Sequence, residues 1–259
     1  MSIIKSFKPT LKKIISMGSI KYCFDFIRGK ILHRRAAVLF AGLFLKLKTK
    51  KFKSLKSLIS TTYGVFFNVL LEQWRIRPGQ VREEFLKLLQ ILAKRQINSM
   101  LEIGTNLGGT LFLFTRVINP HALIISLDLP NGPYGGGYPA WRIPFYKSFS
   151  INDQKMVLLR EDSHKPSTLT KVEKILNESP LDFLFIDGDH SYDGVKADFE
   201  MYKSLVRPGG IIAFHDICPY TELDLGVNRF WNEIKNQIKS VEIIKDSNQI
   251  GFGIGILFI

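Results

Sequence analysis

Short apolar runs alternate with helical patterns along residues 81–259. The stretch 81–95 has apolar residues at helical spacing, and short apolar runs follow at 100–103, 123–127, 156–159, 183–186, 211–214 and 241–244. Parallel strands that are buried on both faces have this continuous apolar character, and the helical patterns between them supply the crossovers. We predict an α/β, doubly wound fold with a mostly parallel sheet and helices on both faces. The last run, 251–259, is predicted to be a strand antiparallel to its neighbours that closes one side of the sheet.

A basic segment precedes this pattern. Residues 1–60 contain 15 Lys or Arg and one acid, so they carry +14, whereas the other 199 residues carry −1. The asymmetry divides the chain into a basic, mostly helical N-terminal segment, 1–78, and a near-neutral domain, 79–259. Residues 36–45 are uncharged, but a membrane-spanning helix needs about 20 apolar residues.

Three roles are open for the basic segment. An apolar stretch flanked by bases suits a helix at an anionic membrane surface. It also suits a helix that packs on the domain, and a basic segment can bind RNA. The two cysteines, Cys23 and Cys218, are far apart in the sequence and form no recognisable disulfide or zinc pattern, and we find no secretory signal. We predict a cytoplasmic protein, with peripheral attachment at the inner membrane face left open.

Polar residues follow the predicted strands. Because the carboxyl ends of parallel strands meet at one edge, we expect these residues to lie around one ligand. They are Glu102, Asp128, Asp162 with Ser163, Asp187 with Asp189 and His190, and His215 with Asp216.

The turn after the first strand is rich in glycine. Its sequence, from Glu102 to Thr110, is EIGTNLGGT, and it leads into an apolar helix. Glycines allow a ligand to approach the backbone, and the first amides of the helix are free donors, so a nucleotide-type ligand is predicted. Asn106 occupies the place of the second glycine in the dinucleotide fingerprint, which disfavours NAD. The carboxylate of Glu102 suits a cationic group better than a pyrophosphate.

These motifs resemble the class I methyltransferases that use S-adenosylmethionine (SAM). The run 182–216, with Asp-Gly-Asp-His and a terminal His-Asp, is similar to the family of cephalosporin hydroxylase-like proteins and sugar O-methyltransferases. The resemblance covers residues 80–259 and implies a Rossmann-like sheet of seven strands. It also implies that Asp128 binds the ribose hydroxyls. The implied cofactor-binding residues are Glu102, Gly104, Thr105, Asn106, Gly108, Asp128, Asp162, Ser163 and Asp187.

A divalent metal is predicted beside the cofactor. Several carboxylates in one cleft repel each other unless a cation lies between them, and oxygen ligands favour Mg²⁺. The resemblance implies Asp187 and Asp216 as ligands. His215 is the third predicted ligand, and it departs from the paired acids of sugar methyltransferases. His190 or Asp189 is the predicted catalytic base. His190 is preferred, because imidazole titrates near neutral pH.

The segment 131–144 is predicted to be a substrate lid, since it is rich in glycine and follows a cofactor strand. Its predicted contact residues are Tyr134, Tyr138, Trp141 and Arg142, although aromatic residues that only cover the sheet fit equally well. The predicted activity is methylation of a hydroxyl on a glycan, a lipid-linked sugar or another secondary metabolite. The alternatives are an RNA-binding methyltransferase, although nucleic acid is not the expected partner, and a non-catalytic scaffold at a membrane. Homo-oligomers are left open.

Overall fold

The computed structural model describes residues 54–63, 76, 78–132, 137–221 and 225–259. The predictions for residues 1–53, including the membrane-surface stretch 36–45, lie outside these ranges and stay predictions. The boundary between the two predicted regions likewise stays a prediction. Among the residues described, none of the helices combines the length and the apolar character that crossing a bilayer requires.

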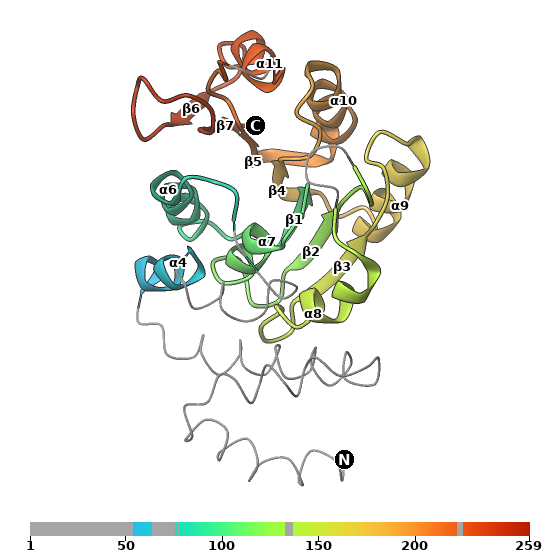
Figure 1. Cartoon of the computed structure of the whole chain (residues 1–259). Coiled ribbons are helices and arrows are strands. Elements are labelled where there is room, and N and C mark those ends of the chain that lie inside the picture. The colour runs from blue at the N-terminus through green and yellow to red at the C-terminus, as the bar shows by residue number, and fades with distance from the viewer. Residues whose placement is uncertain (1–53, 64–75, 77, 133–136, 222–224) are drawn as a thin grey trace, which may run out of the picture.

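A seven-stranded sheet forms the centre of the molecule, in the order β3-β2-β1-β4-β5-β7-β6 (Figure 1). Strands β1 to β5 are parallel, and β7 is antiparallel to both β5 and β6. The strands are β1 (Ser99–Ile103), β2 (Leu123–Leu127), β3 (Lys155–Leu159), β4 (Leu181–Ile186), β5 (Val206–His215), β6 (Ser240–Ile243) and β7 (Ile254–Phe258). The predicted Rossmann-like, mostly parallel sheet is confirmed.

The position of the last strand differs from the prediction. β7 is antiparallel, as predicted, but it lies between β5 and β6 instead of at one side of the sheet, so β6 is the edge strand. Its buried residues, Ile254, Ile256 and Leu257, contribute to both faces of the sheet.

Helices cover both faces of the sheet. One face carries α4 (Leu55–Tyr63), α6 (Arg82–Leu92), α7 (Gly109–Phe114), η2 (Ala140–Arg142) and α8 (Ile143–Lys147), and the other carries α9 (Pro166–Leu176), α10 (Tyr192–Tyr202), η3 (Lys203–Leu205) and α11 (Val227–Ile234). Each helix turns an apolar stripe toward the sheet. In α6 this stripe is Phe85, Leu88, Leu89 and Leu92, all fully buried. The two covered faces form two separate apolar clusters, one on each side of the sheet.

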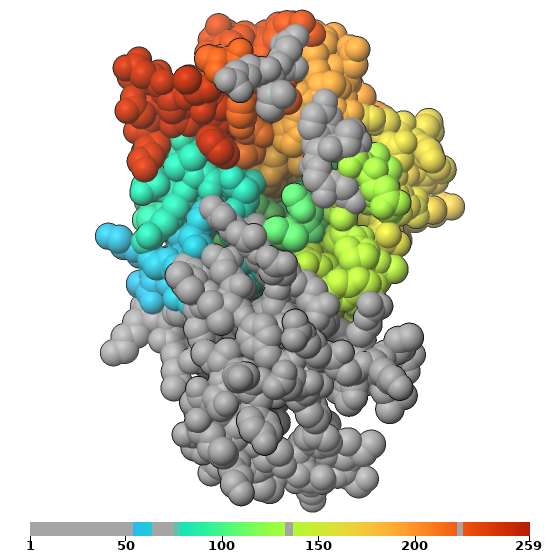
Figure 2. Space-filling model, viewed as in Figure 1, coloured from blue at the N-terminus to red at the C-terminus, as the bar shows by residue number. Residues whose placement is uncertain are grey.

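Helix α6 also connects the start of the domain to its last two strands. Figure 2 shows the blue-green region that contains α6 between the red C-terminal region and the blue atoms of α4. Leu58 and Ile59 of α4 pack in the same apolar cluster as α6. The buried carboxylate of Glu84 accepts hydrogen bonds from the backbone N–H of Lys245, at 2.9 Å, and of Gly253, at 3.0 Å. α6 is therefore held to the connection between β6 and β7.

Candidate functional site

A cavity of about 570 Å³ opens at the carboxyl ends of the parallel strands. The order of the strands reverses there, because β2 and β3 lie on one side of β1 and β4 lies on the other. Open α/β sheets bind ligands at such a reversal, and volumes of about 300–1,000 Å³ suit small molecules. The predicted site residues that line the cavity are Gly104, Thr105, Asn106, Asp128, Asp162, Ser163, Asp187, Asp189, His190, His215 and Asp216.

The glycine turn after β1 packs directly against the loop after β4. Gly104 has a φ of +93°, and a Cβ atom there would lie 1.9 Å from the carbonyl oxygen of Asp187. No other residue fits this position without moving one of the two loops. Gly108, with a φ of +74°, immediately precedes α7. Asn106 also has a positive φ, 43°, which asparagine tolerates better than most residues. The turn therefore presents its backbone to the cavity.

Asp128 organises one side of the cavity. Its Oδ2 accepts hydrogen bonds from the backbone N–H of Asn106, at 3.0 Å, and of Tyr138, at 3.2 Å. Burial raises the pKa of Asp128 to about 6, although the backbone donors oppose this change. The carboxylate thus connects the glycine turn to the segment after β2, and it has further acceptor capacity for a ligand.

Glu102 is fully buried near the end of β1. Its Oε1 accepts a hydrogen bond from the hydroxyl of Thr110 in α7, whereas its Oε2 is buried without a hydrogen-bond partner among the described residues. Burial raises the pKa of Glu102 well above its usual range, and the negative charges of Asp187 and Asp128 raise it further. A cationic ligand group nearby would lower this pKa again.

The loop after β3 forms the far wall of the cavity with Asp162, Ser163 and His164. The imidazole of His164 lies 3.3 Å from the buried carboxylate of Asp198 in α10. The hydrogen bond from His164 to Asp198 raises the pKa of His164 to about 9, although burial opposes the change. This pair joins the loop after β3 to α10.

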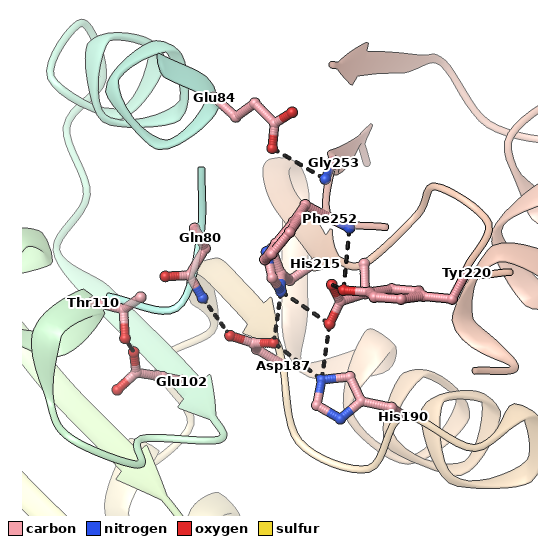
Figure 3. Close-up of polar contacts among 11 residues, drawn as sticks. Gln80, Glu84, Glu102, Thr110, Asp187, His190, His215, Tyr220, Phe252 and Gly253 are labelled. Carbon is pink, nitrogen blue, oxygen red and sulfur yellow. Dashed lines mark hydrogen bonds and ion pairs between the residues drawn. The ribbon is translucent and has the colours of Figure 1, made fainter. Parts of the chain in front are cut away.

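Four side chains from the carboxyl ends of β4 and β5 meet at the other end of the cavity. We call Asp187, His190, His215 and Asp216 the Asp187 cluster; one ligand atom from each lies within 4.8 Å of the others. His215 Nδ1 is 3.1 Å from Asp187 Oδ1 and 3.1 Å from Asp216 Oδ2. His190 Nε2 is 3.0 Å from Asp216 Oδ2 and 3.5 Å from Asp187 Oδ1. Figure 3 shows both imidazoles beside Asp187.

Two neutral side chains hold the carboxylates of the Asp187 cluster from outside. Gln80, just before α6, donates to Asp187 Oδ2 at 2.6 Å, and the hydroxyl of Tyr220 donates to Asp216 Oδ1 at 2.6 Å (Figure 3). Each carboxylate therefore has one oxygen fixed by an outer donor, and its other oxygen faces the imidazoles. Asp216 itself has a φ of +63°, an uncommon value for a residue other than glycine.

Carboxylates and imidazoles set each other's pKa in the Asp187 cluster. Burial lowers the pKa of both imidazoles, but contacts with Asp187 and Asp216 outweigh it and raise the pKa to about 9 for His190 and about 10 for His215. Burial acts to raise the pKa of both carboxylates, but the two histidines hold it below its usual range. In this arrangement the imidazoles donate hydrogen bonds, whereas a general base needs a free lone pair. The role of His190 as a base stays a prediction.

The structure separates Asp189 from the Asp187 cluster. Its Oδ1 accepts a hydrogen bond from the backbone N–H of Ser191 at 2.8 Å, so Asp189 lines the cavity but is turned toward the start of α10. Although Asp189 follows Asp187 by only two residues, it is His190 that joins Asp187 in the cluster. The catalytic role of Asp189 stays a prediction.

Two of the four predicted contact residues of the lid are buried. Tyr138 and Arg142 are 2% and 5% exposed, and Arg142 donates to the hydroxyl of Tyr146. Trp141 packs at the border of the apolar cluster on this face, and Tyr134 lies outside the described residues. The cavity is lined here by Gly132 and Gly137, so the contact roles of the four predicted residues stay predictions.

Sequence reasoning missed four residues at the site. Gln80, His164, Tyr220 and Phe252 all line the cavity. Gln80, Tyr220 and Phe252 come from segments outside the strand ends, where the sequence pattern gives no indication of contact. The glycines on both sides of Phe252 were the one available signal, since they mark an unusual backbone.

One family model matches the centre of the chain. Residues 101–217 match a family described as a methyltransferase domain. A curated relative is an uncharacterized protein, y4gI, of Sinorhizobium fredii, which is 29% identical over 150 residues. This match covers 57% of the present chain and only 16% of y4gI, so the present chain spans a small part of the length of that relative.

Solved structures share the fold over most of the chain. The O-methyltransferase TomG from Streptomyces achromogenes, involved in tomaymycin synthesis and solved in complex with SAM, has a TM-score of 0.50 and 16% identity, over 81% of this chain and 91% of TomG. A putative O-methyltransferase from Klebsiella pneumoniae has a TM-score of 0.52 and 16% identity, over 84% and 94%. The chain thus has the fold of these O-methyltransferase structures, and the match of residues 101–217 to a methyltransferase domain agrees with the resemblance seen in the sequence.

Proposed function

We propose that this protein is a SAM-dependent O-methyltransferase, assisted by a divalent metal ion. The observation that supports this most strongly is that one cavity contains both the glycine turn with Asp128 and the Asp187 cluster. Transfer between two bound molecules requires their sites to adjoin, because the reacting atoms must meet in line.

The cofactor half of the cavity fits SAM in charge as well as in size. Asp128 offers acceptors for ribose hydroxyls, and the backbone of the glycine turn is open to the cavity. The buried Oε2 of Glu102 has no partner among the described residues, and SAM carries two cationic groups that a carboxylate nearby stabilises. Asp162 and Ser163 border the place for the adenine.

The acceptor half of the cavity is assigned to the Asp187 cluster. Asp187, His215 and Asp216 would hold a divalent ion there, and such an ion would supply charge that lowers the pKa of an acceptor hydroxyl. Gln80 and Tyr220 hold the two carboxylates in place. The hydroxyl proton passes to the carboxylate of Asp189, which lines the cavity outside the cluster, as the acceptor oxygen bonds to the methyl carbon and the bond from carbon to sulfur breaks.

The proposed acceptor is a hydroxyl of a glycan, a lipid-linked sugar or another secondary metabolite. TomG, which has the same fold, acts in such a secondary pathway. Attachment of residues 1–60 to an anionic membrane surface would bring the enzyme to lipid-linked acceptors. Co-sedimentation with anionic liposomes at low salt tests this attachment, and no binding would contradict it.

Calorimetric titration with S-adenosylhomocysteine, the product of methyl transfer, tests the cofactor site. We expect one binding site in the wild type and at least tenfold weaker binding in Asp128→Asn, which keeps the size of the side chain and loses its charge. Asp153→Asn is the matched control, because Asp153 is exposed at the opposite end of the sheet near Pro120. A wild type that does not bind, with or without added metal, would overturn the proposed function.

A further inference from the structure

The Asp187 cluster contains nitrogen and oxygen atoms in equal numbers at its centre. The inward atoms are Asp187 Oδ1, Asp216 Oδ2, His190 Nε2 and His215 Nδ1. Every imidazole nitrogen in this set faces two carboxylate oxygens. The carboxylate oxygens that face outward are already occupied by Gln80 and Tyr220. The four inward atoms are therefore held in position by their surroundings.

The distances among these atoms fit one central ion. Ligands at about 2.1 Å from a metal and at right angles to each other are separated by about 3.0 Å. The four contacts between nitrogen and oxygen measure 3.0, 3.1, 3.1 and 3.5 Å. The four side chains therefore need only small movements to surround an ion.

The types of ligand atom decide which ion fits. Mg²⁺ takes oxygen ligands and keeps several of its waters, whereas imidazole suits Fe²⁺, Co²⁺, Ni²⁺ and Zn²⁺. Two imidazoles among four ligands are therefore unfavourable for Mg²⁺. Outer hydrogen bonds such as those from Gln80 and Tyr220 orient the ligands of transition metals and increase affinity.

We propose that the Asp187 cluster is a transition-metal site with two aspartate and two histidine ligands, in which His190 is a ligand and not the catalytic base. This inference refines the metal part of the proposed function. Four ligands from the protein leave positions on a five- or six-coordinate ion for an acceptor oxygen. Metal binding itself does not require methyl transfer, so it can be measured separately.

Cobalt provides the direct test, because the visible absorption of Co²⁺ reports on its ligands. The full-length protein is freed of metal with a chelator and titrated with Co²⁺, and the bound Co²⁺ is then challenged with Mg²⁺. We expect one Co²⁺ per chain, new visible bands, and affinity at least 100-fold higher than that for Mg²⁺. His190→Asn should weaken Co²⁺ binding at least tenfold and change the bands. Gln80→Ala should weaken it about 10- to 100-fold without removing the bands.

His121→Asn is the matched control, since His121 is exposed just before β2, at the end of the sheet opposite the cavity. It should keep the affinity and the bands of the wild type. Circular dichroism checks that each variant is folded. Equal affinity for Mg²⁺ and Co²⁺, unchanged binding in His190→Asn, or no binding of either ion would overturn the proposal. Binding of S-adenosylhomocysteine in the same samples reports on the cofactor site, so failure of the metal site and failure of the proposed function give different results.

Discussion

Phe252 has a backbone conformation that a large side chain rarely adopts. Its φ is +58°, and its neighbours Gly251 and Gly253 have φ values of +73° and +81°. Hydrogen bonds hold Phe252 in place: its N–H donates to the hydroxyl of Tyr220, and its carbonyl accepts from the N–H of Cys218. Strain of this kind concentrates at ligand sites, and the ring of Phe252 lies beside His215 of the Asp187 cluster.

Replacing Phe252 by two different small residues measures this strain. Phe252→Ala removes the ring and keeps the unfavourable φ, whereas Phe252→Gly removes both. We expect the glycine variant to have a free energy of unfolding about 1 kcal/mol higher than the alanine variant. Denaturant unfolding measures the difference. At Ile250, which is 58% exposed and does not have a positive φ, the same pair of substitutions should give the opposite order. The same order at both positions would contradict the strain.

The site residues at the strand ends could be predicted from the sequence, but the site residues that come from the surrounding segments could not. Asp128, Asp187 and Asp216 were expected at one edge because parallel strands end together. Gln80 and Tyr220 reach the same carboxylates from segments with no periodic pattern, and their contacts depend on how distant parts of the chain pack. The orientation of Asp189 also escaped prediction, since the turn after β4 decides which of two nearby carboxylates faces His215 and Asp216.

At the scale of whole elements, one buried carboxylate of α6 accepts hydrogen bonds from the backbone of the connection between β6 and β7. Glu84→Ala leaves the N–H groups of Lys245 and Gly253 without their acceptor, and the one on Gly253 is buried. We expect a loss of about 2–4 kcal/mol in the free energy of unfolding. Denaturant unfolding monitored by circular dichroism checks this value.

Glu83→Ala is the control for this substitution on the same helix. The Glu83 side chain is 55% exposed and lies 3.5 Å from the Lys245 ammonium, and a solvent-exposed ion pair of this kind contributes little to stability. Equal effects of the two substitutions would show that the connection from α6 to the hairpin does not depend on Glu84.

The existence and the type of the strands followed from the sequence, whereas the place of the last strand did not. Continuous apolar runs identify buried strands by themselves, and each expected run overlaps a strand of the sheet. A run such as that of β7 has the same local pattern whether it lies in the interior or at the edge. Its pairing with both β5 and β6 is determined by contacts far apart in the sequence.

The stability of the whole molecule should depend on pH through His164. The pKa of His164 is about 9 in the folded protein and 6.5 in the unfolded chain. The contacts of protonated His164 therefore contribute their full stabilisation below pH 6.5. This contribution is lost as the pH rises from 6.5 through about 9. Burial raises the pKa of the partner Asp198, and the interaction with His164 opposes this change.

Comparison of the wild type with His164→Gln isolates this contribution, because other titrating groups affect both proteins equally. Thermal unfolding from pH 6 to pH 10, without ligand, should show a gap in Tm that is widest at pH 6 and narrows toward pH 9. A gap that stays constant with pH would mean that the interaction of His164 with Asp198 does not depend on charge.

The place of β7 also determines the order in which the sheet can be completed during synthesis. The ribosome produces β6 before β7, yet β6 pairs only with β7 within the described sheet. Until β7 emerges, the edge of β5 beside Ile212 and Phe214 is open, and an open apolar edge is a template for pairing with another chain. The nascent protein is therefore open to aggregation at this edge until β7 has emerged and paired, although the strands that carry the glycine turn and Asp128 are made earlier.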